Sequence, residues 1–276
     1  MPDIWLASCA AWPTAWTDGP PIDAAFTALG VDARWAVWDD PAVDWAAAPL
    51  VAIRATWDYF DRYTEFLAWA ERVAAATTLV NPLPVVRWNT RKDYLIDLGA
   101  DGVPVVPTDV VPAGEPLTAL TDQVVKPAVG GGGRGVVVVR AGESLDTSDT
   151  LRIAQPLVGS IRTEGEYSVF LLGGEPVAAV VKLPAGDEIR VHEVYGGDTK
   201  PTELTDELRG VALTAMRATE RRFGVTLPYG RADLMRLDDG TLAVNELELV
   251  EPSLYCPELP EMPIAFAAAM RDLLPR

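Results

Sequence analysis

A lysine followed by a glycine-rich loop is the first segment whose residues are suited to chemistry. Lys126 ends an expected strand over residues 123–126, and the loop 130–135 reads Gly-Gly-Gly-Gly-Arg-Gly. A lysine at a strand end offers a point charge to a phosphate, and flexible glycine backbone can lay N–H groups over the remaining phosphate oxygens. The loop lacks the Gly-Lys-Ser/Thr of a Walker A motif, and the strand expected after it excludes a Rossmann fingerprint. Taken alone, the segment also fits an ordinary glycine-rich hairpin.

Three carboxylates form a second group. Glu246 and Glu248 are two residues apart on an expected strand, so their side chains leave the same face. Two carboxylates on one face repel each other unless a cation or a proton lies between them. With Asp233 from a neighbouring strand, the three would suit one or two Mg²⁺ ions that bridge nucleotide phosphates. The same alternation fits a solvated edge strand, so the pattern alone leaves both interpretations open.

A third segment, residues 182–192, carries cations on both sides of a turn. Lys182 and Arg190 flank this turn and can fold back against a transferring phosphoryl group, where negative charge develops. In isolation, a charged surface hairpin explains the same residues. The segment also holds His192, the single histidine of the chain. A multi-histidine zinc site is therefore excluded, and a Ser-His-Asp hydrolase would have to use this residue.

The composition narrows the classes of protein to which these groups could belong. The chain has 276 residues and a net charge of −17, which disfavours a nucleic-acid partner because phosphate backbones are repelled. We find no run of 18 apolar residues and no basic flank at the N-terminus, so neither a membrane span nor a signal peptide is expected. Two cysteines, Cys9 and Cys256, fit a reducing cytoplasm.

The elements that position these groups divide near residue 88. All nine tryptophans lie between Trp5 and Trp88, which indicates a domain boundary there. The region before it alternates between strand and helix patterns, which is typical of a small parallel α/β unit. The expected strands are residues 4–7, 34–38 and 50–54, and the expected helices are residues 22–29 and 64–76.

Beyond residue 88 the elements mix without strict alternation, which indicates an α+β arrangement. A short helix is expected over residues 89–98 and a long one over 206–223, each ending at a glycine. The expected strands are residues 123–126, 136–140, 167–172, 177–183, 232–237 and 242–249. The first two enclose the glycine-rich loop, which is therefore the mobile tip of a hairpin.

The order of these segments along the chain resembles the ATP-grasp superfamily. Lys126 and the glycine loop come first, the hinge 155–158 follows, and Arg190, Asp233 and the run 246–248 complete the order. Within that superfamily, the segments 54–59, 88–95 and 248–254 look like those of the D-cycloserine-forming cyclo-ligases and related actinobacterial biosynthetic enzymes. Bacterial glutathione synthetase is a more distant relative. The resemblance implies an N-terminal pre-ATP-grasp α/β domain over residues 1–88 and two nucleotide-clasping lobes. The central lobe, with the glycine loop, would span residues 89–158, and the C-terminal lobe, with the magnesium site, residues 159–276.

The resemblance also implies roles for individual residues. ATP would be held by Lys92 and Lys126 at the α- and β-phosphates, by Gly131, Gly132 and Gly133 over the β- and γ-phosphates, by Gln155, Leu157 and Val158 at the adenine edge, and by Glu166 at the ribose. Mg²⁺ would be held by Asp233, Glu246 and Glu248, the last of which replaces the asparagine of many family members. Arg190, with Lys182 nearby, would steady the γ-phosphate and the acyl phosphate. The substrate would meet Arg54, Asp58, Tyr59, His192 and Ser253. For Tyr59, packing between domains is the alternative, and for His192 it is a catalytic role.

The activity implied is that of an ADP-forming ligase. A substrate carboxylate attacks the γ-phosphate of ATP to give an acyl phosphate, and a nitrogen nucleophile displaces phosphate. The nucleophile either belongs to the same molecule, as in an O-ureido-serine-like amino acid that closes to cycloserine, or is a separate amine that forms an amide or dipeptide. A small-molecule kinase and a non-catalytic ATP-binding module remain as alternatives from other classes. The expected partner is a small amino-acid-like carboxylate, with no nucleic acid and no membrane. The resemblance is also compatible with a homodimer.

Overall fold

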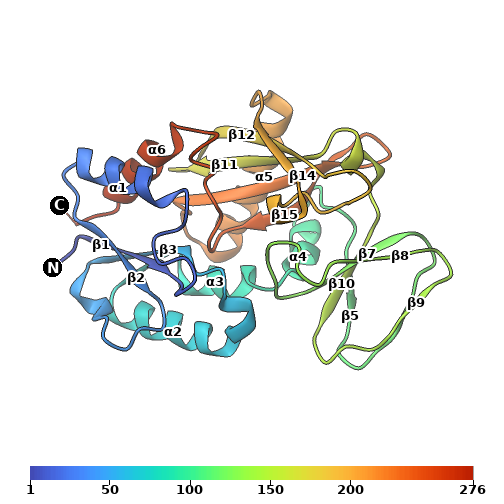
Figure 1. Ribbon diagram of the computed structural model, residues 1–276, viewed down its shortest axis with the longest axis horizontal. Helices are drawn as coiled ribbons and strands as arrows, with labels where there is room; N and C mark the ends of the chain where they lie inside the picture. Colours follow the sequence, from blue (N-terminus) through green and yellow to red (C-terminus); the bar gives the residue numbers. More distant parts are fainter. Residues whose placement is uncertain (276) are drawn as a thin grey trace.

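The N-terminal region is a parallel sheet flanked by helices, as the alternating pattern predicts. The computed structural model describes residues 1–275. Four parallel strands lie in the order β2-β1-β3-β4 (Figure 1). They are β1 Ile4–Ser8, β2 Ala33–Val37, β3 Leu50–Ala55 and β4 Thr78–Val80, and the helices are α1 Gly19–Ala28 and α2 Tyr63–Ala76. Helix α1 begins earlier than expected because its prolines occupy the first turn, where a missing N–H costs nothing.

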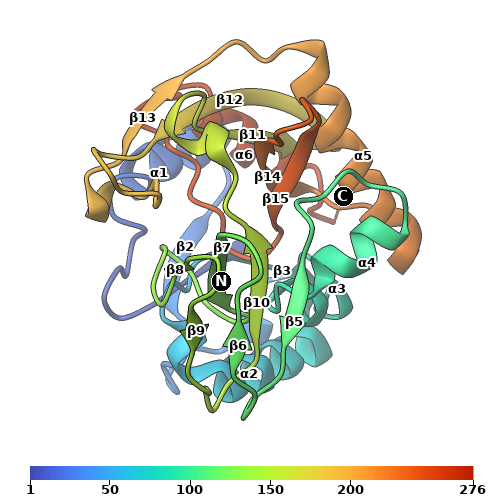
Figure 2. The same cartoon turned by 90° about the vertical axis from the view of Figure 1, so that its right-hand side faces the viewer.

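A second, antiparallel sheet carries the glycine-rich loop. Its strands follow the order β5-β10-β7-β8, and a two-stranded ribbon of β6 and β9 extends it (Figure 2). The strands are β5 Asp109–Val111, β6 Leu117–Thr118, β7 Gln123–Pro127, β8 Val137–Val139, β9 Ser144–Leu145 and β10 Arg152–Pro156. Strands β7 and β8 form the expected hairpin, with the glycines at its tip.

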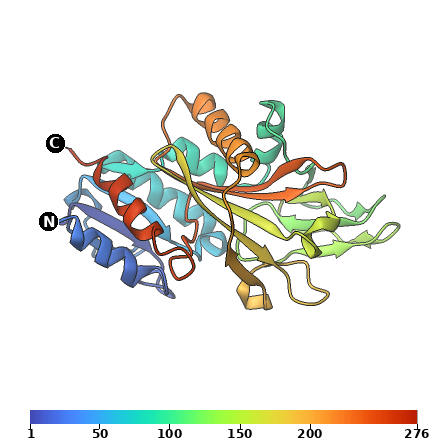
Figure 3. The ribbon, with the colours of Figure 1, turned by 90° about the horizontal axis from the view of Figure 1, so that it is seen from above.

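The third sheet is antiparallel and has five strands in the order β13-β12-β11-β14-β15. Its strands are β11 Glu166–Leu172, β12 Glu175–Leu183, β13 Asp198–Pro201, β14 Tyr229–Arg236 and β15 Leu242–Glu248. The long helix α5, Asp206–Phe223, covers one face and buries Ala212, Ala215 and Met216 against it (Figure 3). The last helix, α6 Met262–Arg271, packs against α1, where the rings of Phe26 and Phe266 meet edge to face.

Two short helices replace the single one expected over residues 89–98. Helix α3 spans Leu83–Asn89 and α4 spans Tyr94–Ala100. The break follows from tertiary hydrogen bonds, because the backbone N–H of Lys92 donates to the carbonyl of Ala128 at 2.8 Å. Four 3₁₀ turns complete the elements: η1 Trp45–Ala47, η2 Tyr59–Arg62, η3 Gly159–Arg162 and η4 Glu193–Tyr195. Among residues 1–275, no helix has the length and apolar character to cross a membrane.

The outer edge of strand β15 is covered by side chains and loop backbone. The carbonyl of Leu247 accepts from the amide of Asn89, and its N–H donates to the hydroxyl of Tyr94, both at 2.6 Å. Leu249 is bound in the same way, by Asn89 and by the side chain of Asn81. Strand β15 is thereby held at one register, with Asp233 opposite Glu246 on strand β14.

Candidate active site

A cavity of about 190 Å³ lies between the second and third sheets. It is lined by the hairpin tip, by strands β7, β11, β12, β14 and β15, and by the loop that follows β12. Most of the residues expected at the site line this one cavity: Lys92, Lys126, Gly131, Gly132, Gly133, Gln155, Leu157, Val158, Glu166, Lys182, Arg190, His192, Asp233, Glu246 and Glu248. Segments that are more than 150 residues apart in the sequence are thus assembled around a single space.

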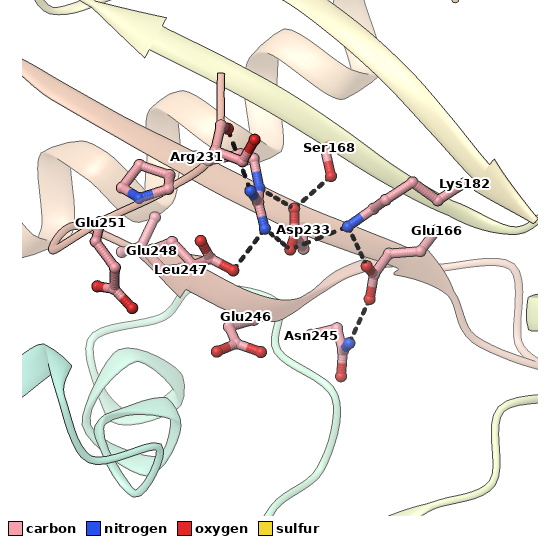
Figure 4. Close-up of polar contacts among 12 residues, drawn as sticks. Glu166, Ser168, Lys182, Arg231, Asp233, Asn245, Glu246, Leu247, Glu248 and Glu251 are labelled. Atoms are coloured by element: carbon pink, nitrogen blue, oxygen red, sulfur yellow. Dashed lines mark hydrogen bonds and ion pairs between the residues drawn. The ribbon is translucent and has the colours of Figure 1, made fainter. Parts of the chain in front are cut away.

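Lys182 is at the centre of the buried ion pairs in this cavity (Figure 4). Its ammonium lies 2.6 Å from Glu166 Oε1 and 3.3 Å from Asp233 Oδ2. Burial alone would lower the pKa of Lys182, but the carboxylates of Asp233 and Glu166 raise it well above its usual value. Glu166 also accepts a hydrogen bond of 2.6 Å from the amide of Asn245. The charge of Lys182 is therefore held in place by two buried carboxylates.

Arg231 is a functional candidate to which the sequence reasoning gave no role. Its guanidinium is buried, forms two 2.9 Å bonds to Asp233 and also contacts Glu248. A signal was available, because Arg231 is two residues before Asp233 and so points to the same face of strand β14. The fork of an arginine matches a carboxylate or phosphate in two places at once. Arg231 can therefore receive an acyl phosphate or its displaced oxygen.

The three carboxylates expected to hold Mg²⁺ share the cavity but do not form a preassembled triad. Within residues 1–275, no group of three or more aspartate, glutamate, histidine or cysteine side chains is arranged to hold a metal ion. Each carboxylate is paired with a cation instead: Glu246 with Lys92 at 2.7 Å, and Asp233 and Glu248 with Arg231. Carboxylates that are close together require a positive charge between them, and these side chains supply it. The donor set consists of hard oxygen ligands, which is the chemistry that Mg²⁺ prefers.

Lys92 and Lys126 also line this cavity. Lys92 donates to the carbonyl of Gly130 at 2.6 Å, while Lys126 contacts the amide oxygen of Asn245 at 3.4 Å. Burial lowers the pKa of Lys126, and Glu246 only partly offsets this. A phosphate near Lys126 would stabilise its charged form.

The hairpin tip is shaped for glycine and is contacted on both sides. Gly133 has φ +71°, and a Cβ there would lie 3.0 Å from the ring of Tyr195 and 3.2 Å from Arg190 Cδ. Arg190 stacks on that ring at 3.5 Å and pairs with Glu188 at 2.6 Å. On the other side, a Cβ at Gly131 would meet Phe60 of the N-terminal region. The tip is thus held over the cavity, close to Arg190.

The residues expected at the adenine edge lie in strand β10 and just after it. The side chain of Gln155 is engaged with Thr108 at 3.0 Å, and the N–H of Leu157 donates to the carbonyl of Asp122 at 2.9 Å. Val158 is buried and lines the cavity. His192 also lines the cavity, where burial lowers its pKa and its Nδ1 accepts from the N–H of Val194.

Four residues expected to meet the substrate lie outside this cavity. Arg54 is buried, donates to the carbonyl of Pro252 at 2.7 Å and stacks over Phe266. The remaining three are also engaged elsewhere: Asp58 with the indole of Trp38, Tyr59 in an aromatic cluster with Phe66, and Ser253 with Asp18. The contacts of Arg54 and Ser253 lie at the junction of the N-terminal region with the segment after β15, whereas those of Asp58 and Tyr59 lie within the N-terminal region. Tyr59 therefore packs with an aromatic residue of its own region, and the cavity does not include these four side chains.

Glu251 is a carboxyl group next to the site, and its raised pKa makes the stability of the protein depend on pH (Figure 4). Burial, reinforced by Glu248, raises the pKa of Glu251 to about 8. Its native pKa is above its usual value, so the native state binds more protons than the unfolded state, and stability falls as pH rises from about 4.5 to about 8. Glu251→Gln should therefore be more stable than the wild type at pH 8.5, by about 2 kcal/mol, and similar at pH 4.5.

Urea unfolding of the two proteins in Mg²⁺-free buffer measures this difference. The matched control is Glu175→Gln, at an exposed glutamate far from the cavity, which should leave the pH dependence unchanged. If the free energy of unfolding depends on pH equally in Glu251→Gln and in the wild type, the raised pKa of Glu251 is wrong.

Residues 4–81 match the family model for the N-terminal domain of the D-cycloserine synthetase DcsG, and residues 115–227 match that for the ATP-grasp domain of prokaryotic glutathione synthetase. The cycloserine biosynthesis protein DcsG of Streptomyces lavendulae is 34% identical, over 93% of this chain and 94% of that protein. Glutathione synthetase of Thermosynechococcus vestitus is 29% identical, over 75% of this chain and 70% of that one.

The solved structures agree with these matches. A crystal structure of D-cycloserine synthetase DcsG superposes with a TM-score of 0.84 at 30% identity and covers 98% of both chains. A D-alanine–D-alanine ligase from Bacillus anthracis superposes with a TM-score of 0.66 at 12% identity, over 98% of this chain and 96% of that one, which bears on the fold alone.

Proposed function

Because this chain belongs to the ATP-grasp family, in the group of the cycloserine biosynthesis protein DcsG, we propose that it closes an O-ureido-serine-like amino acid to cycloserine. The chain is an ATP-dependent, ADP-forming ligase that joins a carboxylate to a nitrogen nucleophile. The observation that carries the cyclisation is the match over nearly the full length of both chains, which includes the DcsG-type N-terminal region.

The lining of the cavity supports a reaction that needs no covalent enzyme intermediate. Cations and carboxylates line it, and none of its lining residues within 1–275 is a serine, threonine or cysteine. Catalysis would then come from positioning the reactants and from neutralising charge. Both contributions are expected when a phosphoryl group is transferred between two bound molecules.

In the first half-reaction, the substrate carboxylate attacks the γ-phosphorus of ATP and ADP leaves. Lys92 and Lys126 would hold the α- and β-phosphates, and the backbone of the glycine tip would cover the β- and γ-phosphates. Arg190, close to that tip, would steady the transferring phosphoryl group, and the buried ammonium of Lys182 would neutralise charge on it. The product is an acyl phosphate, with ADP released on the nucleotide side.

In the second half-reaction, the carbamoyl-bearing nitrogen of the same molecule attacks the acyl carbon, loses its proton to solvent and expels phosphate. After the ring has closed, water must still remove the carbamoyl group as carbamate, which decomposes to CO₂ and ammonia, to give cycloserine. Arg231 would stabilise the negative charge that develops on the acyl oxygen and on the departing phosphate. Water would otherwise compete for the acyl phosphate, so the cavity must keep water out until the ring has closed.

Asp233, Glu246 and Glu248 are the residues that would hold Mg²⁺, since their oxygens fit its preference. When bound, Mg²⁺ would neutralise phosphate charge that the side-chain cations do not reach. Lys92 and Arg231 would then exchange their carboxylate partners for phosphate oxygens. The pairing of these cations with the carboxylates supports this exchange, because the cations already lie beside the oxygens that would bind the ion.

Phosphorus NMR with Mg-ATP tests the proposal. The protein is incubated with and without a panel of amino acids that includes O-ureido-D-serine. We expect ADP and free phosphate to appear only with that compound, and a cyclic product that mass spectrometry identifies. Phosphate found on an organic product would make the protein a kinase. Saturable ATP binding without turnover of any panel member would make it a binding module.

An intermolecular ligase is the second candidate. The match of residues 115–227 to the glutathione synthetase ATP-grasp domain favours it. In the same assay it would release phosphate only when a carboxylate and a separate amine are both present, whereas the cyclo-ligase requires a single organic substrate.

We further propose that the enzyme works as a cytoplasmic homodimer. Both cysteines are free and buried, which fits a reducing compartment. Light scattering of the purified protein tests the assembly, and the mass of a monomer at micromolar concentration would refute the homodimer.

A further inference from the structure

Tyr255 has an unusual backbone conformation and faces the cavity. Its φ is +50°, in the left-handed region that bulky residues avoid. The residue lies in the segment between β15 and α6, and its side chain lines the cavity together with Lys182 and Arg231. A strained conformation of this kind persists only where the surrounding structure holds it, and such residues concentrate at functional sites.

Asp18 holds the backbone on both sides of Tyr255. One carboxylate oxygen accepts from the N–H of Leu254 at 2.8 Å, and the other accepts from the N–H of Cys256 at 2.9 Å. The first oxygen also accepts from the hydroxyl of Ser253 at 3.0 Å. Asp18 is only 3% exposed, and it comes from the N-terminal region, more than 230 residues away in the sequence. The turn at Tyr255 is therefore imposed by a distant carboxylate.

Two further residues with positive φ lie just before Asp18 in the sequence. Ala15 has φ +54° and Trp16 has φ +49°, and Asp18 comes two residues later. Among residues 1–275, these and Tyr255 are the non-glycine residues with positive φ. All of that strain thus lies in the two segments that Asp18 joins. This concentration indicates that the fold tolerates strain here in order to place a side chain.

The side chain so placed lies among the cations of the site. The guanidinium carbon of Arg231 is 5.8 Å from the centre of the Tyr255 ring, and Phe170 packs edge to face against the same ring. Burial raises the pKa of the Tyr255 phenol, although Lys182 and Arg231 act in the opposite direction. The phenol therefore keeps its proton and can donate a hydrogen bond.

We propose that Tyr255 is a catalytic residue whose phenol O–H donates to the substrate's acyl oxygen, and that Asp18 is the positioning residue that holds it there. Negative charge grows on this oxygen when the nitrogen nucleophile attacks. Lys182 and Arg231 are each shared with carboxylates, whereas a phenol adds a donor without a further charge. A fixed donor in a water-poor site stabilises such an oxygen far more than water would. The inference rests on the ligase reaction proposed above.

Tyr255→Phe removes the O–H alone and keeps the ring, the left-handed turn and the contacts of Asp18. We expect kcat to fall about 100-fold, with the KM for ATP and the melting temperature unchanged. Tyr255→Gly can adopt φ +50° freely, so it should remain folded and lose at least as much kcat. The matched control is Tyr63→Phe, a tyrosine outside the cavity that contacts Thr90, which should retain wild-type kcat.

Asp18→Asn tests the positioning role, because the amide nitrogen cannot accept the N–H of Cys256 or Leu254. We expect it to lower kcat with little change in the KM for ATP, and to have little additional effect in the Tyr255→Phe background. Additive losses in the double variant would assign Asp18 a merely structural role.

The wild type separates this inference from the proposed function. Absence of ADP formation by the wild type with every panel member would refute the proposed function itself. If the wild type turns over and Tyr255→Phe retains kcat within twofold, the role of Tyr255 is wrong and the ligase assignment stands.

Discussion

Glu246→Gln is expected to reduce ADP formation at least 1,000-fold, on the order of the loss of a central electrostatic group. Glu246 lies opposite Asp233 in the register of β14 and β15, and its carboxylate contacts the ammonium of Lys92 at 2.7 Å. Burial would raise the pKa of Glu246, but Lys92 and Lys126 lower it, so it is a charged oxygen ligand at neutral pH. Glutamine keeps the shape and removes that charge, which weakens Mg²⁺ binding and leaves the two lysines less compensated.

Coupled detection of ADP measures the effect, and calorimetric titration of Mg²⁺ in the presence of a non-hydrolysable ATP analogue provides a reading independent of turnover. Glu164→Gln is the matched control, since Glu164 pairs with Arg236 outside the cavity. Turnover of Glu246→Gln within tenfold of the wild type would exclude Glu246 from the metal site.

Arg231→Met is expected to lose both turnover and stability. The guanidinium is the buried partner of Asp233 and also contacts Glu248, so its removal leaves Glu248 without its cation and Asp233 with Lys182 alone. Breaking a buried ion pair on one side costs about 3–5 kcal/mol. Turnover should fall about 1,000-fold, because the developing charge on the acyl group loses its bidentate donor.

Mg²⁺ offers a way to separate these two losses. If the carboxylates bind the ion, millimolar Mg²⁺ should restore part of the stability of Arg231→Met in urea unfolding, with no recovery of turnover. Arg231→Lys keeps a charge without the fork, so it should be more stable than the methionine variant and still slow. On the same strand, Arg236→Met removes half-exposed ion pairs and should cost at most about 1 kcal/mol. An Arg231→Met protein as stable as the wild type without Mg²⁺ would contradict the pairing.

The parts of the fold that could be predicted are those in which local pattern and long-range packing agree. Strand β1 and helix α2 were predicted to within one residue, because the apolar residues that reveal their periodicity are also the residues that they bury. Strands of two or three residues, such as β6 and β5, have too few residues to show a period. The break between α3 and α4 was not predicted from the sequence for another reason. It depends on a long-range hydrogen bond from the backbone N–H of Lys92 to the carbonyl of Ala128.

The site divides in the same way. Lysines, glycines and acidic residues in a fixed order could be grouped because each residue type indicates its chemistry. Arg231 received no role from the sequence, because the argument around Asp233 concerned oxygen ligands alone. The surroundings of Arg54 and Ser253 could not be foreseen, since their partners are about 200 residues away and depend on how the N-terminal region meets the segment after β15.

The covered edge of β15 has a consequence for how the enzyme behaves in a crowded solution. An uncovered outer strand offers rows of N–H and carbonyl groups to which another polypeptide can add by templated strand pairing. Here asparagine and tyrosine side chains occupy those groups at Leu247 and Leu249, and the backbone around Val105 occupies them at Val244. The strand that carries Glu246 and Glu248 is therefore closed to amyloid-like recruitment, and it can present charged groups to the reaction without becoming a seed for aggregation.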